Sequence, residues 1–168
     1  LALEAAQAGG QPHGLGVAIG GYAVAQALEG AWRSGLQGCL QADEIYRTQC
    51  FGVTWERDTS ETFIQTSLLR LGEFNQAHQR ATRVLAGALD RGDLFIDTLI
   101  TTTSLAFIKL VRDEPDEATR VIQDAIARWP SRGFQVPDAW ASHRLIQVAL
   151  YRGEGRHALE STRRYLRS

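Results

Sequence analysis

The sequence predicts an all-α fold built from antiparallel helical hairpins that stack on one another. Apolar residues recur at three- and four-residue spacing along most of the chain, which is typical of one buried face on an α-helix. Turn residues return at nearly constant intervals, which indicates a repeated structural unit. No convincing strand remains between these segments, so about eight helices account for the chain.

The repeat consists of a turn residue that is followed five positions later by a small residue. The turn residues are Gly30, Gly72, Asp113 and Gly153, and the small residues are Gly35, Ala77, Ala118 and Ala158. The turn residues are 42, 41 and 40 positions apart, and a period that steady predicts four hairpins. We expect each small residue to let the second helix of its hairpin approach the first closely.

Helices fill the intervals between the turns. From Phe74 onward the apolar residues form one stripe, and Pro115 suits a first helical turn, where its missing N–H costs nothing. That helix should end at Trp129, because Pro130 disfavours helical geometry in the residue before it. The expected helices are, in chain order, 14–29, 32–48, 53–71, 74–90, 94–112, 115–129, 138–152 and 155–167.

The short links between these helices imply antiparallel neighbours, and one hairpin cannot bury its apolar face alone. We therefore expect residues 1–168 to form a single stacked domain. The first ten residues, LALEAAQAGG, look like the end of a preceding helix. Because the chain starts at Leu1 and contains no methionine, we expect it to be a fragment of a longer protein.

Composition narrows the functional class. Hydrophobic residues make up 44% of the 168 residues and charged residues 22%, which is typical of a folded globular domain. The formal net charge is -1 and no long basic run is present, so a nucleic-acid partner is not expected. The longest apolar stretch, LGVAIGGYAVAQAL, is 14 residues long and interrupted by glycines, which is too short to cross a bilayer.

The termini and cysteines favour a cytoplasmic location. No charged leader with an apolar region and a cleavage site opens the sequence. The two cysteines, Cys39 and Cys50, are eleven residues apart and form neither a zinc motif nor a disulfide framework. We expect both to be inert.

Several short patterns resemble catalytic or binding motifs but have simpler structural interpretations. GLGVAIGG at 14–21 lacks the preceding strand and the following lysine of a phosphate-binding loop. Arg91-Gly92-Asp93 reads as a helix end followed by an Asp cap. The histidines are scattered and none has metal-ligand spacing; they are His13, His78, His143 and His157. We expect no catalytic residue, no metal site and no cofactor.

Residues 49–62, QCFGVTWERDTSET, carry more chemistry than the rest of the chain. Phe51-Gly52 is expected to form the turn between two hairpins, and Trp55 to anchor the following helix against a neighbour. Asp58 with the following hydroxyl and acidic residues resembles a capped helix start. The alternative is that Trp55, Glu56 and Asp58 contribute to a groove at the edge of the array.

The repeat resembles a tetratricopeptide repeat. The turn glycine, the aromatic residue two positions later (Trp32, Phe74), the small residue at five, and Pro130 seventeen positions after Asp113 carry this resemblance. It implies a right-handed solenoid, although a usual repeat has about 34 residues, so the match is to a relative with longer helices. The aromatic is missing at Pro115 and Gly155.

A narrower resemblance covers the chain from about Gly14 to its end. CFGVTWERDT, the RGDL segment at 91–94 and ARWPSRGFQVPDAW at 127–140 are similar to the C-terminal helical region of large bacterial serine/threonine protein kinases with a signalling ATPase module. The glycine-rich loop, H-R-D and D-F-G signatures of a kinase are absent from the sequence. This piece is therefore not expected to phosphorylate a substrate.

The resemblance to tetratricopeptide repeats implies a concave groove lined by the first helix of each hairpin. The implied groove positions are Thr59, Thr62, Thr66, Ile100, Thr103, Phe107, Trp140, His143 and Gln147. These side chains offer hydroxyls, aromatic rings, an amide and an imidazole for an extended peptide. No basic clamp for a carboxylate lies among them.

The leading hypothesis is therefore a non-catalytic interaction domain, the scaffold or sensor region of a bacterial signalling protein. Its partner would be a protein or peptide, including other domains of the parent chain. The second hypothesis is a regulatory domain that senses a small molecule. The third is an enzyme, which would need a cleft with converging titratable groups whose pKa values are strongly shifted.

Overall fold

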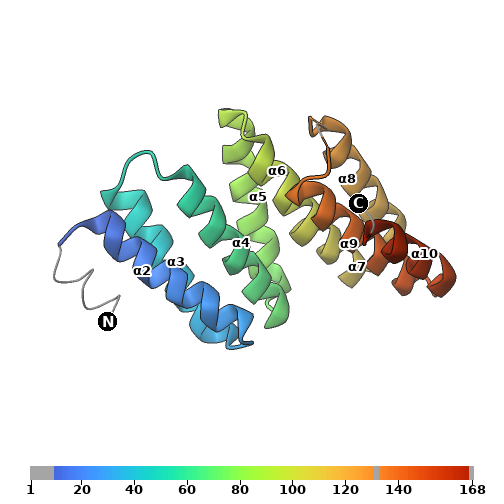
Figure 1. Ribbon diagram of the computed structural model, residues 1–168, viewed down its shortest axis with the longest axis horizontal. Helices are drawn as coiled ribbons and strands as arrows, with labels where there is room; N and C mark the ends of the chain where they lie inside the picture. The colour runs from blue at the N-terminus through green and yellow to red at the C-terminus, as the bar shows by residue number, and fades with distance from the viewer. Residues whose placement is uncertain (1–9, 131–132, 167–168) are drawn as a thin grey trace. The chain divides into compact units, whose positions relative to one another are not determined.

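The computed structural model describes residues 10–130 and 133–166, and in these residues every regular element is a helix (Figure 1). The expected tail of a preceding helix, residues 1–9 of LALEAAQAGG, lies outside the described residues. The elements are α2 (Pro12–Leu28), α3 (Trp32–Gln49), α4 (Thr54–Arg70), α5 (Phe74–Arg91), α6 (Leu94–Ile100), the π-helix η1 (Thr101–Leu105), α7 (Ala106–Val111), α8 (Pro115–Arg128), α9 (Val136–Tyr151) and α10 (Gly155–Tyr165).

The all-α fold class is confirmed, and the helices begin and end within two residues of the expected positions in the described part of the chain. Pro115 occupies the first turn of α8, and α8 ends before Trp129 and Pro130, as expected. One expected helix, 94–112, is instead three segments in continuous succession, because a π-turn at 101–105 interrupts it.

The same turn geometry ends five of the helices. Gly30, Gly72 and Gly153, which were expected to be turn residues, have φ values of +89°, +78° and +76°, and Asp113 is the non-glycine residue with φ of +60°. After Gly72, the amide of Glu73 donates to the carbonyl of Leu68 at 2.9 Å. Such a left-handed residue lets the chain close the helix end with two hydrogen bonds, and glycine adopts it without steric cost.

The chain divides into two compact units, residues 1–76 and residues 77–168. In the N-terminal unit, α2 and α3 form an antiparallel hairpin and α4 packs on both of them. The α2–α3 contact is made by small residues: a Cβ atom at Gly38 would lie 2.5 Å from the Cβ of Ala23, and one at Gly35 would lie 2.9 Å from that of Ala27. The two backbones therefore approach closely at this seam, as the small residue at position 35 predicted.

Tyr46 on α3 closes the other end of the N-terminal unit. Its side chain packs with Ala42 and Val53, and a Cβ at Gly16 would lie 2.5 Å from its ring. Glu56 at the start of α4 accepts a hydrogen bond from the His13 ring of α2 at 2.9 Å. This contact joins the first helix of the unit to the last.

The C-terminal unit has larger apolar side chains in its core. Ile96, Leu99 and Ile100 of α6 pack against Ala81 and Ala88 of α5. A second cluster joins α7, α8 and α9 and contains Ala106, Leu110, Ala118, Ile122, Ala141 and Val148. Burying one side chain such as that of Ile122 contributes about 1.5–3 kcal/mol.

Two expectations about single residues have different outcomes. The small residues five positions after the turns, Ala77, Ala118 and Ala158, are buried as expected. The expectation that Trp55 anchors α4 against a neighbouring helix is wrong, because 69% of this residue is exposed. Trp55 stands in the second position of α4, and Val53, just before the helix, packs against Ala42 and Tyr46 of α3 instead.

One continuous helical segment, Leu94–Val111, is long and apolar enough to pass a membrane-span test, with a mean hydropathy of 1.6. Asp97 and Lys109 interrupt the apolar run of this segment, so its sequence did not stand out as a possible membrane span. However, 56% of the segment is buried inside the protein, as for a core helix. Such a helix is compatible with a soluble domain.

Candidate functional site

Helix α9 carries three of the expected groove residues on one exposed ridge. A capping box fixes the start of this helix, with Asp138 accepting from the amide of Gln135 at 2.9 Å. The rings of Trp140 and His143 meet edge to face, with centroids 6.4 Å apart and planes at 77°. One turn further on, Gln147 Nε2 lies 3.4 Å from His143 Nε2. The three side chains therefore form one connected row.

Arg144 lies beneath this row and was not singled out by the sequence analysis. It is 7% exposed. Its Nε donates to the carbonyl of Thr102 at 3.3 Å and its Nη2 to that of Thr103 at 2.6 Å. Its Nη1 donates to the side-chain oxygen of Gln147. One guanidinium thus joins α9 to η1 and holds the half-buried amide of Gln147 in place.

The π-turn explains why these carbonyls accept bonds from another helix. A π-turn inserts an extra residue into the α-helical ladder, so backbone groups there depart from the regular i to i+4 pattern. The hydroxyls of Thr102 and Thr103 donate back to the carbonyl of Leu99, at 3.2 and 2.6 Å. Thr103 therefore presents a hydroxyl whose hydrogen is already engaged, and Arg144 supplies donors for the buried carbonyls.

Phe107 on α7 completes the cluster. The Arg144 guanidinium carbon lies 4.9 Å from the centre of the Phe107 ring, within the range of a cation–π interaction. Three expected groove residues, Thr103, Phe107 and Gln147, thus contact the same guanidinium. A sequence-level signal existed, because Arg144 occupies the apolar stripe of α9 between Ala141 and Val148.

Two hollows flank the ridge of α9. The first, which we call the α7–α9 hollow, has a volume of about 450 Å³ and is lined by Phe107, Leu110, Val111, Gln147, Leu150 and Tyr151. The second, the α9–α10 hollow, has a volume of about 530 Å³ and is lined by Ala139, Trp140, His143, Ile146, Thr162, Tyr165 and Leu166. Both have mainly apolar walls with few polar groups, which is the usual character of ligand sites.

A carboxylate lies at the edge of the α7–α9 hollow. The phenol of Tyr151 donates to Asp113 Oδ1 at 2.7 Å, and this hydrogen bond raises the pKa of Tyr151. The acidic groups that follow Asp113 are also paired, since Glu114 accepts from Lys109 and Glu117 from Arg120. These pairs give the acidic turn a structural explanation.

The remaining groove positions do not join this cluster. Ile100 is fully buried in the core between α5 and α6, so its assignment to a groove is wrong. Thr59, Thr62 and Thr66 are half-buried on α4 of the N-terminal unit. Thr62 and Thr66 donate to helix carbonyls four residues earlier at 2.8 Å, which engages their hydroxyl hydrogens within α4.

The N-terminal unit holds Cys39 and Tyr46, whose pKa values are raised. Burial raises the pKa of the Cys39 thiol to about 11. Burial and the nearby Glu56 carboxylate raise the pKa of Tyr46 to about 12. Both groups stay protonated at neutral pH, so Cys39 is a poor nucleophile, in line with its expected inertness.

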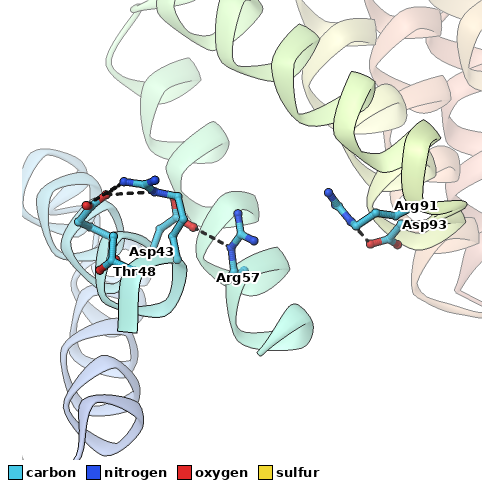
Figure 2. A network of polar contacts seen from close by, with 7 residues as sticks. Asp43, Thr48, Arg57, Arg91 and Asp93 are labelled. Atoms are coloured by element: carbon cyan, nitrogen blue, oxygen red, sulfur yellow. Dashed lines mark hydrogen bonds and ion pairs between the residues drawn. The ribbon is translucent and has the colours of Figure 1, made fainter. Parts of the chain in front are cut away.

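The segment from Trp55 to Asp58 does not assemble a groove of its own. Trp55 is exposed, Asp58 is buried, and the hydrogen bond from His13 lowers the pKa of Glu56. Figure 2 shows Arg57 reaching Asp43 on α3, with Nε and Oδ1 3.4 Å apart. This contact has the form of a bridge between neighbouring helices.

The Arg91-Gly92-Asp93 segment has the structural role that the sequence predicted. Gly92 has φ of +65°, and Asp93 caps α6 by accepting from the amide of Ile96 at 3.3 Å. Arg91 lies 3.8 Å from the same carboxylate (Figure 2). Within residues 10–130 and 133–166, no three His, Cys, Asp or Glu side chains gather as a metal site would require.

Comparisons with known proteins identify no relative: no family model matches the chain, and no curated protein matches it.

Proposed function

We propose that the C-terminal unit is a non-catalytic interaction domain that binds an extended segment of a partner protein along the ridge of α9. The observation that supports this most is the convergence of Phe107, Gln147 and Thr103 on Arg144, beside two apolar hollows. A buried cation with several partners is a rigid support, and a rigid support holds contact side chains in a fixed geometry.

The chemistry of the ridge suits a peptide. Trp140 and Phe107 offer rings to apolar side chains, while His143 and Gln147 offer polar groups to a backbone. An extended strand needs both kinds of contact at intervals of a few residues. The hollows on the two sides of α9 provide places for bulky side chains.

We further propose that this domain belongs to a larger bacterial signalling protein, with a serine/threonine kinase-like parent, in the cytoplasm. The support is the similarity of three segments of the sequence to such C-terminal regions. In that setting the partner is a separate protein or another domain of the same chain. The proposal assigns no catalytic step and no cofactor to residues 1–168.

The proposal is tested by panning a library of random twelve-residue peptides on the full chain. Peptides that are enriched are then measured by fluorescence anisotropy against a Trp140→Ala, His143→Ala double variant. We expect the double variant to weaken binding by about tenfold or more. Trp55→Ala is the matched control, because Trp55 is exposed in the N-terminal unit, and should leave affinity within twofold.

Absence of any enriched peptide, or equal affinity for the double variant and the control, would count against the α9 site.

A small-molecule sensor is a second candidate, and the α9–α10 hollow of about 530 Å³ favours it. That volume lies within the range of about 300–1,000 Å³ for ligand pockets. Screening metabolites by thermal shift separates the two candidates, because a ligand at one hundred times its Kd adds about 2.7 kcal/mol of stability.

A further inference from the structure

The side-chain amide of Gln147 has a defined orientation. Its partner Arg144 is a guanidinium, which donates hydrogen bonds and accepts none. The atom of Gln147 that meets Arg144 Nη1 is therefore the oxygen Oε1. Consequently the amide nitrogen Nε2 points away from Arg144, toward the ridge of α9.

The amide nitrogen has more donor capacity than its neighbours use. One hydrogen of Gln147 Nε2 is directed to His143 Nε2 at 3.4 Å, a long contact. Its second hydrogen has no partner among residues 10–130 and 133–166. Gln147 also lines the α7–α9 hollow, so its side-chain amide lies at the wall of an apolar site.

The surroundings of this donor select a neutral acceptor. Leu110, Val111 and Leu150 line the hollow with apolar groups, and none of its lining residues is acidic or basic. Tyr151 also lines it, but the phenol hydrogen is engaged by Asp113. The nearby Arg144 guanidinium is already engaged by carbonyl oxygens, Gln147 Oε1 and the Phe107 ring, and the Asp113 carboxylate bonded to Tyr151 repels an anionic ligand. The Gln147 N–H therefore suits an uncharged carbonyl oxygen.

Resting on the proposed peptide-binding function, we propose that Gln147 is a specificity-determining residue that donates from Nε2 to a backbone carbonyl of the bound segment. The occupant of the α7–α9 hollow is then a bulky apolar side chain of an extended peptide, next to that carbonyl. An extended strand suits this arrangement, because its carbonyls and its side chains alternate along the chain. Arg144 acts as a positioning residue, since it sets which end of the amide faces the ligand.

The sharpest test is Gln147→Glu, which keeps the shape of the side chain and exchanges the donor for an acceptor. The new carboxylate still accepts from Arg144, so the cluster should remain folded and the melting temperature should not fall. The probe is the tightest fluorescein-labelled twelve-residue peptide obtained by panning on the full chain. We expect its affinity to fall about tenfold or more.

Gln123→Glu is the matched control, because it makes the same charge change at an exposed position of α8. We expect it to change the affinity by less than twofold. A set of ester analogues of the probe adds a second measurement, since an ester carbonyl is a weaker acceptor than an amide carbonyl. One ester position should weaken binding to the natural chain and have no further effect on the Gln147→Glu variant.

The outcomes separate the two proposals. A peptide that needs Trp140 and His143 but binds Gln147→Glu and Gln123→Glu equally well overturns the role of Gln147 and leaves the peptide site standing. If the loss of affinity in Gln147→Glu adds to the loss from every ester substitution, the role of Gln147 is also overturned, because no peptide carbonyl would then be coupled to the Gln147 donor. Failure to enrich any peptide overturns both proposals.

Discussion

The two units of the chain bury different kinds of ionisable side chain. The N-terminal unit buries acidic groups: Cys39 and Tyr46, whose raised pKa values keep both neutral at physiological pH, and the carboxyl side chains of Asp58 and Glu61. The C-terminal unit buries a basic group, Arg144, which is charged at every accessible pH. Tyr46 lies in close contact with α2 at Gly16, whereas the Arg144 cation is surrounded by carbonyl oxygens and a ring.

This difference indicates how one helical architecture gives two surfaces. Glycine and alanine at the α2–α3 seam let two backbones meet directly. The C-terminal unit has larger core residues, and its π-turn at Thr101–Leu105 interrupts the regular α-helical hydrogen bonds between α6 and α7. The two hollows flank α9, the helix whose Arg144 bonds to carbonyls of that π-turn. Departures from regular helical geometry are frequent at functional sites, which supports the α9 ridge as the binding surface.

The largest expected effect is that of Arg144→Met. This variant keeps much of the side-chain length but removes the donors to Thr102, Thr103 and Gln147. Because buried carbonyls lose a charged partner, we expect the free energy of unfolding of the C-terminal unit to fall by about 3 kcal/mol. Hydrogen exchange of the α6–α7 amides should accelerate, while that of the α2–α3 amides should not.

Arg112→Met is the control for this prediction, because Arg112 is exposed at the end of α7. Its cost should stay within about 0.5 kcal/mol. If Arg144→Met cost as little as Arg112→Met, the guanidinium would not be supporting the π-turn.

Alkaline pH should affect the N-terminal unit more than the C-terminal unit. The pKa of Cys39 rises from its usual 9.0 to about 11, and that of Tyr46 from 10.0 to about 12. In this range the folded chain holds protons that the unfolded chain releases, so stability is fully present below pH 9 and falls as the pH rises toward 12. By about pH 10.5 we expect a loss of about 2–3 kcal/mol, measured by denaturant titration and by hydrogen exchange of the α2–α4 amides.

Tyr46→Phe isolates the phenol in this prediction. It should flatten the decline above pH 10, whereas Tyr22→Phe, at a position that is 65% exposed, should leave the decline unchanged. An equal decline in both units, or a decline that Tyr46→Phe does not alter, would contradict the assignment.

Much of the fold could be predicted because local signals agree with it. The turn residues at 30, 72 and 153 are glycines in a left-handed conformation, and the spacing of apolar residues defined where each helix runs. The π-turn could not be predicted, because TTTSL contains no glycine or proline that marks an interruption. Two of its carbonyls, those of Thr102 and Thr103, accept hydrogen bonds from Arg144, which is 41 positions further along the chain than Thr103.

The candidate site was only partly predictable. Repeat positions identified Thr103, Phe107, Trp140, His143 and Gln147, of which Trp140 and His143 are exposed and the other three are half-buried. They missed Arg144, because a pattern that counts groove positions ignores a charged residue on the buried face. They also included Ile100, which the α5–α6 packing places in the core. The repeat spacing thus placed Ile100 on the wrong face, and it carried no information on the contacts of the other residues.

The smallest of the three effects is expected at the α2–α3 seam, where Gly38→Ala and Gly21→Ala should have opposite signs. A methyl group at Gly38 would lie 2.5 Å from the Cβ of Ala23, so the helices must move apart, whereas nothing lies within 4 Å of a methyl group at Gly21. Alanine is favoured over glycine within a helix by about 0.5–1 kcal/mol. Gly21→Ala should therefore raise the free energy of unfolding by about that amount. Gly38→Ala has the same gain but also an overpacking cost that exceeds it, so it should lower the free energy of unfolding by about 1–2 kcal/mol. Chemical denaturation of both variants measures the difference. If both variants were more stable than the natural chain, the α2–α3 seam would have room for a methyl group at position 38, contrary to the close approach described here.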